Sequence, residues 1–91
     1  MAKGAVVVQR RDREDDDALV RIGFTATRKI GGAVVRNRAK RRLREAVRRL
    51  APLHTTGGCD YVFVARAGTV GRPWERLLDD VKSALISVAP T

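Results

Sequence analysis

Hydrophobic and polar residues alternate near the start of the chain in the way that β-strands require. Residues 5–9 form a short apolar run rich in β-branched side chains, which predicts a strand. A second strand is predicted over residues 19–27, where every other side chain is apolar: Val20, Ile22, Phe24 and Ala26. Residues 10–17 between them are almost entirely charged. This pattern predicts an antiparallel hairpin with an acidic connection.

Apolar residues then recur at helical spacing after a turn at residues 28–32. A helix is predicted from Ala33 to about Leu50, ending before Pro52, which disfavours a continuing helix. Its apolar positions are Val35, Ala39, Leu43, Ala46, Val47 and Leu50. They fall within an arc of about 120°, which suits packing of one side of the helix on a sheet.

The last part of the chain predicts one more strand and one more helix. Residues 61–66 are nearly all apolar, which is typical of a central strand. Pro73 suits the first turn of a helix, and the apolar spacing from Trp74 extends this helix to about Val88. The element order is therefore β-β-α-β-α in one domain over residues 1–91, an α+β or α/β sandwich. Its parts are the hairpin and basic helix, 5–50, and the strand and second helix, 61–88.

The net charge of the chain indicates which kind of partner it binds. Lys and Arg number 19 against 10 acidic residues, so the net charge is +9. Such a charge attracts polyanions, of which nucleic acid is the first candidate and an anionic membrane surface the second. No apolar run reaches the ~20 residues that a membrane span needs, so no membrane-spanning segment is expected. Nucleic acid is the favoured polyanion, and no membrane partner is expected. With the single cysteine, Cys59, no disulfide can form within the chain. We expect a cytoplasmic protein.

Basic residues concentrate on the first predicted helix and the turn before it. Residues 28–49 contain ten of them, opposed only by Glu45. Like charges at these spacings destabilise a helix, and binding to a phosphate backbone would remove that repulsion. Asn37 is expected to contact an RNA base edge or sugar, with local capping as the alternative. The predicted RNA-binding residues are Arg28, Lys29, Arg36, Asn37, Arg38, Lys40, Arg41, Arg44 and Arg48.

The run from Arg28 to Glu45, RKIGGAVVRNRAKRRLRE, closely resembles the signature of the bacterial ribonuclease P protein family. Arg36-Asn37-Arg38 matches the RNR motif of that family, and residues 22–27 resemble its second strand. The later elements follow in the same order, so the resemblance covers about residues 5–88.

The resemblance implies a fold and a function. The fold would be ribonuclease P protein-like (ribosomal protein domain 2-like), with a left-handed β-α-β crossover. The protein would be the non-catalytic subunit of an RNA-based endoribonuclease that removes the 5′ leader of precursor tRNA. Its partners would be the catalytic RNA and precursor tRNA. Mg²⁺ would be bound with the RNA, and the protein alone would hold no metal, cofactor or catalytic residue.

The resemblance also implies a leader-binding cleft on the sheet. The expected contacts are Thr25, Thr27, Tyr61 and Phe63, with the core as the alternative place for the two aromatic residues. Family members carry a helix before the first strand, and this chain is expected to lack it. The strands carry apolar residues on both sides, so we expect a partly bare apolar patch and self-association of the shortened chain.

Three rival functions fit a basic domain of this size. A ribosomal RNA-binding or assembly protein would copurify with ribosomal subunits. A DNA-binding protein would lay the basic helix in the major groove. A self-sufficient nuclease would cleave RNA unaided, but His54 has no nucleophile or acid at a readable catalytic spacing. The acidic residues of the connection lack the spacing of a calcium loop and are expected to form a solvated turn.

Overall fold

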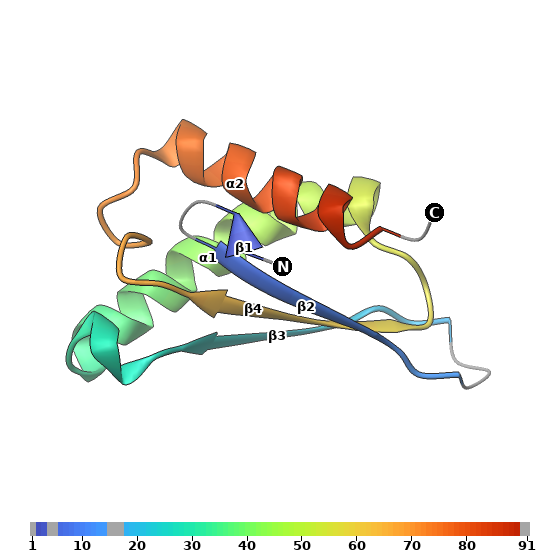
Figure 1. Cartoon of the computed structure of the whole chain (residues 1–91), viewed down its shortest axis with the longest axis horizontal. Helices are drawn as coiled ribbons and strands as arrows, with labels where there is room; N and C mark the ends of the chain where they lie inside the picture. Colours follow the sequence, from blue (N-terminus) through green and yellow to red (C-terminus); the bar gives the residue numbers. More distant parts are fainter. Residues whose placement is uncertain (1, 4–5, 15–17, 90–91) are drawn as a thin grey trace.

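A four-stranded sheet with two helices on one of its faces forms the protein (Figure 1). This computed structural model describes residues 2–3, 6–14 and 18–89. The elements in chain order are β1 (Ala2–Lys3), β2 (Val6–Asp12), β3 (Arg21–Ala26), a 3₁₀ turn η1 (Arg28–Ile30), α1 (Ala33–His54), β4 (Cys59–Ala65) and α2 (Trp74–Ser87). The predicted β-β-α-β-α order is confirmed, with β1 added at its start. Neither helix in the described part of the chain is long and apolar enough to cross a membrane.

The strand β4 lies in the middle of the sheet, as its apolar sequence predicts. The order is β1-β2-β4-β3, with β2 antiparallel and β3 parallel to β4. Val8 of β2 and Phe24 of β3 both lie opposite Phe63. The predicted hairpin is therefore wrong, because β2 and β3 do not pair with each other. A strand with apolar side chains on both faces buries more surface between two neighbours than at an edge.

The connection between β2 and β3 passes the beginning of β4 and is tied to it. Arg13 donates a hydrogen bond from Nη1 to Oδ1 of Asp60 (2.6 Å) and one from Nη2 to the carbonyl of Leu19 (2.6 Å). The backbone of Gly58 accepts a hydrogen bond from the Arg13 amide and donates one to the Leu19 carbonyl. These contacts hold β2 and β3 one strand apart. Residues 15–17, the last three of the predicted acidic connection, lie outside the described residues.

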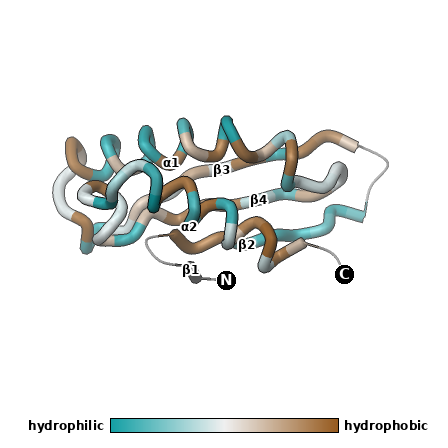
Figure 2. Tube along the Cα trace, turned by 90° about the horizontal axis from the view of Figure 1, so that it is seen from above, coloured by the Kyte–Doolittle hydropathy of each residue, from teal (hydrophilic) through white to brown (hydrophobic). Residues whose placement is uncertain are grey.

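The path from β3 through α1 to β4 has the handedness that the family resemblance implies. Figure 1 shows β3 and β4 pointing in the same direction, with α1 returning above the sheet. Figure 2, seen from above, places β3 behind β4 relative to the view in Figure 1. The chain thus makes a left-handed β-α-β crossover, against the usual right-handed preference.

The core lies between the sheet and the two helices. From α1 the fully buried side chains include Leu43 and Val47, and from α2 Leu77 and Leu85. Hydrophilic and hydrophobic stretches alternate along α1 in Figure 2, as expected of a helix that buries one side. On the other face of the sheet, Val7, Val62 and Val64 are half-buried, and no helix in the described part of the chain covers them.

The end predicted for the first helix is wrong by one turn. The helix continues through Pro52 to His54. Pro52 is exposed and lies in the last turn, where it removes one backbone hydrogen bond, that to the carbonyl of Arg48. Ala51 packs into the core, and its carbonyl accepts hydrogen bonds from the amide (3.0 Å) and hydroxyl (2.6 Å) of Thr55. Burial of Ala51 and this pair of bonds stabilise the extra turn.

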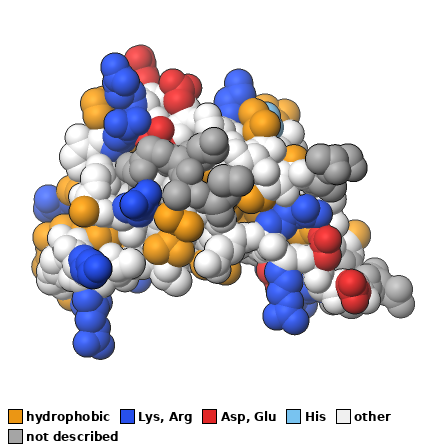
Figure 3. All heavy atoms as spheres, viewed as in Figure 1, with side chains coloured by type: hydrophobic (Ala, Val, Ile, Leu, Met, Phe, Trp, Pro, Cys, Tyr) orange, Lys and Arg blue, Asp and Glu red, His pale blue; other side chains and the backbone are white. Residues whose placement is uncertain are grey.

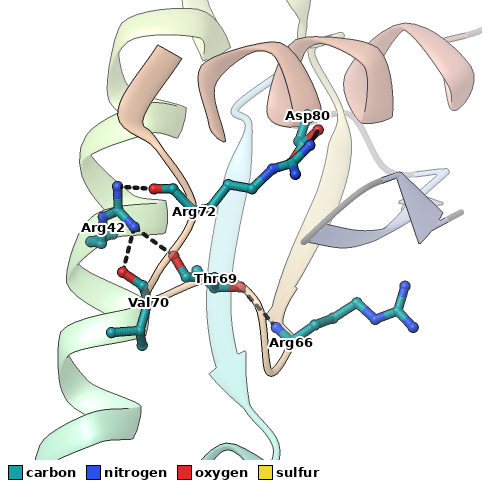
Figure 4. Close-up of polar contacts among 6 residues, drawn as sticks. All are labelled: Arg42, Arg66, Thr69, Val70, Arg72 and Asp80. Carbon is teal, nitrogen blue, oxygen red and sulfur yellow. Dashed lines mark hydrogen bonds and ion pairs between the residues drawn. The ribbon is translucent and has the colours of Figure 1, made fainter. Parts of the chain in front are cut away.

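One arginine of α1 holds the β4–α2 loop in place (Figure 4). Arg42 donates from Nη1 to the carbonyls of Thr69 (2.7 Å) and Val70 (2.7 Å), and from Nη2 to the carbonyl of Arg72 (2.6 Å). The same loop is tied to α2, because Arg72 donates two hydrogen bonds to Asp80, which raises the pKa of Arg72. Arg42 is therefore a structural residue within a helix of otherwise similar arginines.

We expect Arg42→Ala to lower the free energy of unfolding by about 2 kcal/mol or more, since it leaves three half-buried carbonyls without a charged donor. Arg41→Ala is the matched control, because Arg41 is exposed and has no bonded partner among the described residues. Its effect should stay within about 0.5 kcal/mol. Urea unfolding followed by circular dichroism measures both, and equal effects would contradict the structural role of Arg42.

Candidate nucleic-acid interface

The outward face of α1 is the most strongly charged surface that one element presents. Its opposite face is fixed in the core by Ala39, Leu43, Ala46, Val47 and Ala51. Because the helix buries only one side here, most of the basic residues between these positions point outward, and Arg42 is the one that reaches a neighbouring loop instead. Burial of the apolar side therefore orients the charged side.

The chain enters this helix through a glycine turn that leaves its first N–H groups without a side-chain cap. Gly31 has a φ of 140°, which side-chain-bearing residues rarely adopt, and an added Cβ would lie 3.4 Å from that of Val35. Gly32 is the N-cap residue and makes no side-chain capping bond, and the first turn contains no acidic residue. Such a helix start, with Arg28 and Lys29 in η1 just before it, favours a bound anion.

The structure places the predicted RNA-binding residues on this one surface, in and before α1. Seven of them are exposed: Arg28, Lys29, Asn37, Arg38, Arg41, Arg44 and Arg48. Arg36 and Lys40 are half-buried. The Nε of Arg36 is buried and has no hydrogen-bond acceptor within the described part of the chain. An open hollow of about 300 Å³ is lined by Val34, Asn37, Arg38 and Arg41.

Charge on this surface is poorly neutralised by the protein itself. Glu45 is the one acidic residue of α1, and its carboxylate lies 3.7 Å from Arg48 Nη1 and 3.9 Å from Arg49 Nε. Arg38 and Arg41, further toward the start of the helix, have no ion pair among the described residues. Figure 3 shows the near face of the molecule, with α1 behind it. There Lys and Arg side chains are interspersed with acidic and apolar ones instead of forming one patch.

Two aromatic rings lie beneath arginines of α1. The Arg44 guanidinium lies 5.6 Å from the centre of the Phe24 ring. The ring of Trp74, at the start of α2, lies beneath the guanidinium groups of Arg42 (5.9 Å) and Arg49 (5.3 Å). All three distances fall in the range of cation–π interactions. Trp74 packs against the core, as its place in the apolar stripe predicts, and is half-buried.

The residues predicted to bind the leader do not lie together. Thr25 and Thr27 are exposed, and Thr25 is on the face of the sheet away from the helices. Tyr61 and Phe63 are 1% and 0% exposed and point into the core, so their assignment as leader contacts is wrong and the alternative position is correct. Alternate residues of β4 face opposite sides, which places Val62 and Val64, not the aromatic residues, beside Thr25.

The roles of Arg42 and Phe24 are not evident from the sequence. Arg42 looks like its neighbours in the sequence, and nothing there indicates that its guanidinium reaches three loop carbonyls 27–30 residues away. Phe24 was expected only as an apolar residue on the inner face of its strand. The helical phase places Arg44 opposite the apolar arc, and only the packing of α1 over β3 shows that it covers this ring.

The donor set at this surface suits anions rather than metal ions. Its polar groups are guanidinium, ammonium and amide groups, whereas Mg²⁺ binds mainly carboxylate and other oxygen ligands. No group of three or more His, Cys, Asp or Glu residues in the described ranges could hold a metal ion. The arrangement can bind phosphates and offers hydrogen bonds from Asn37 beside them.

Comparisons with known proteins show which family the sequence matches. The family model for Ribonuclease P matches residues 1–89. The Ribonuclease P protein component of Caulobacter vibrioides is 66% identical over 98% of this chain, which spans 60% of the length of that relative. The corresponding protein of Ruegeria pomeroyi is 49% identical over 90% of this chain and 67% of its own length.

The fold is also similar to that of a solved relative. The RNase P protein from Thermotoga maritima superposes with a TM-score of 0.76 at 26% identity, over 93% of this chain and 78% of that protein. Because the family model matches nearly all of the sequence and the fold agrees, the chain belongs to the ribonuclease P protein family.

Proposed function

We propose that the chain is the protein subunit of ribonuclease P and binds the catalytic RNA through the outward face of α1. The observation that carries the proposal is the cluster of exposed, unneutralised basic residues around Asn37 in the matched motif. Phosphate contacts from these residues would supply affinity, and Asn37 would contact a base edge or sugar. The protein would thereby assist removal of the 5′ leader from precursor tRNA.

The physical basis of the proposed RNA binding is the release of counterions from the RNA. Basic side chains that neutralise RNA phosphates displace the ions condensed on the RNA, which makes binding strong and dependent on salt. Binding would also relieve the repulsion between like charges along α1. These gains favour RNA over a neutral partner.

In this proposal the RNA carries the chemistry and its Mg²⁺, and the protein supplies no catalytic group or metal ligand. The cationic donor set of α1 supports that division of roles, since it repels a divalent cation. The site of action would be the cytoplasm, where precursor tRNA is processed.

Reconstituted cleavage tests the function. With a bacterial RNase P RNA at limiting Mg²⁺, adding the chain should accelerate cleavage of the precursor tRNA leader, because protein cations screen repulsion between the two RNAs. Cleavage by the chain without RNA would indicate a nuclease, and copurification with ribosomal subunits without any acceleration would favour the ribosomal alternative.

Removing three charges from α1 tests the interface. The variant with Arg36→Ala, Arg38→Ala and Arg41→Ala should bind the RNA more weakly, with the salt dependence flattened by up to about three units of slope. The matched control removes three exposed charges from elsewhere: Arg66→Ala, Arg76→Ala and Lys82→Ala. Filter binding across a salt series measures both. Equal losses in the two variants would contradict a specific interface on α1.

A further inference from the structure

Three groups are stacked at the edge of the sheet. The rings of Phe63 and Phe24 are stacked with centroids 5.8 Å apart and planes 24° from parallel. The guanidinium of Arg44 lies 5.6 Å from the centre of the Phe24 ring. Phe63 is completely buried, Phe24 is half-buried and Arg44 is exposed. The stack therefore connects the rigid core to a solvent-facing cation.

The hydrogen-bonding capacity of Arg44 is unused. No carboxylate or carbonyl bonds its guanidinium within the described part of the chain, and Glu45 pairs with Arg48 and Arg49 instead. Arg42, by contrast, donates to three carbonyls. Arg44 thus lies over an aromatic ring, and its five N–H donors have no acceptor among the described residues.

This arrangement suits bidentate recognition of a phosphate. A guanidinium binds two phosphate oxygens through its edge, and contact with a ring uses its face, so the two interactions are compatible. A restrained side chain loses less conformational entropy on binding than a free one. We propose that Phe24 is a positioning residue, which holds Arg44 for bidentate contact with an RNA phosphate. The proposal rests on RNA binding by α1.

A double-mutant cycle tests the coupling. Phe24→Leu keeps an apolar side chain on β3 but removes the ring, and should lower affinity for a bacterial RNase P RNA about two- to five-fold. The slope of the salt dependence should not change, because no charge is lost. In a chain that already carries Arg44→Ala, Phe24→Leu should have no effect on affinity. An equal loss in both backgrounds, or none in either, would overturn the proposal.

Two further variants separate positioning from folding. Phe24→Tyr keeps the ring face and should bind RNA as the unchanged chain does, whereas loss in both Phe24 variants would indicate a packing effect. Arg44→Lys keeps the charge but not the planar fork, and should cost more affinity than Arg41→Lys, since no ring of the described residues lies beneath Arg41.

The proposed function is judged separately, by the triple variant of Arg36, Arg38 and Arg41. If that variant binds RNA as tightly as the unchanged chain, the interface itself is wrong. If it loses binding while the cycle shows no coupling, only the role of Phe24 fails.

Discussion

Packing of the apolar side of α1 against the inner face of the sheet, over β3 and β4, is the interaction on which the rest of the structure depends. Leu43 and Val47 of the helix and Phe63 of β4 are almost completely buried and belong to the same core. Because the burial of one helix side fixes the direction of the other, this packing also determines where the basic residues point. The core thus orients the proposed RNA-binding surface, and no separate scaffold is needed.

Arginines of one helix divide into structural and available groups. Arg42 donates its hydrogen bonds to loop carbonyls and so joins α1 to the segment that leads into α2. Arg38 and Arg41 have no such partner among the described residues and line an open hollow. Arg44 shares a feature with each group: it contacts a ring of the core, but its N–H donors stay available. All four side chains are chemically the same, and only their tertiary contacts give them different roles.

The periodicity of the sequence predicted every main element, because alternation and helical spacing are local properties. Strand pairing was not predictable in the same way, since β2 and β3 lie on either side of a strand that follows 33 residues or more after them. Which face of β4 meets the helices was also undetermined. Its two faces, with Phe63 on one and Val62 on the other, are both apolar. The matched motif predicted which helix carries the candidate site, but the supporting contacts of Arg42 and Arg44 depend on tertiary structure.

Side-chain NMR gives the most direct test of whether the outward face of α1 binds RNA. The Nε–Hε signals of individual arginines can be followed while a bacterial RNase P RNA is added. Our account predicts that the signals of Arg38 and Arg41 shift or broaden first, while that of Arg76 on α2 stays unchanged. A response at Arg76 with none at Arg38 and Arg41 would contradict it.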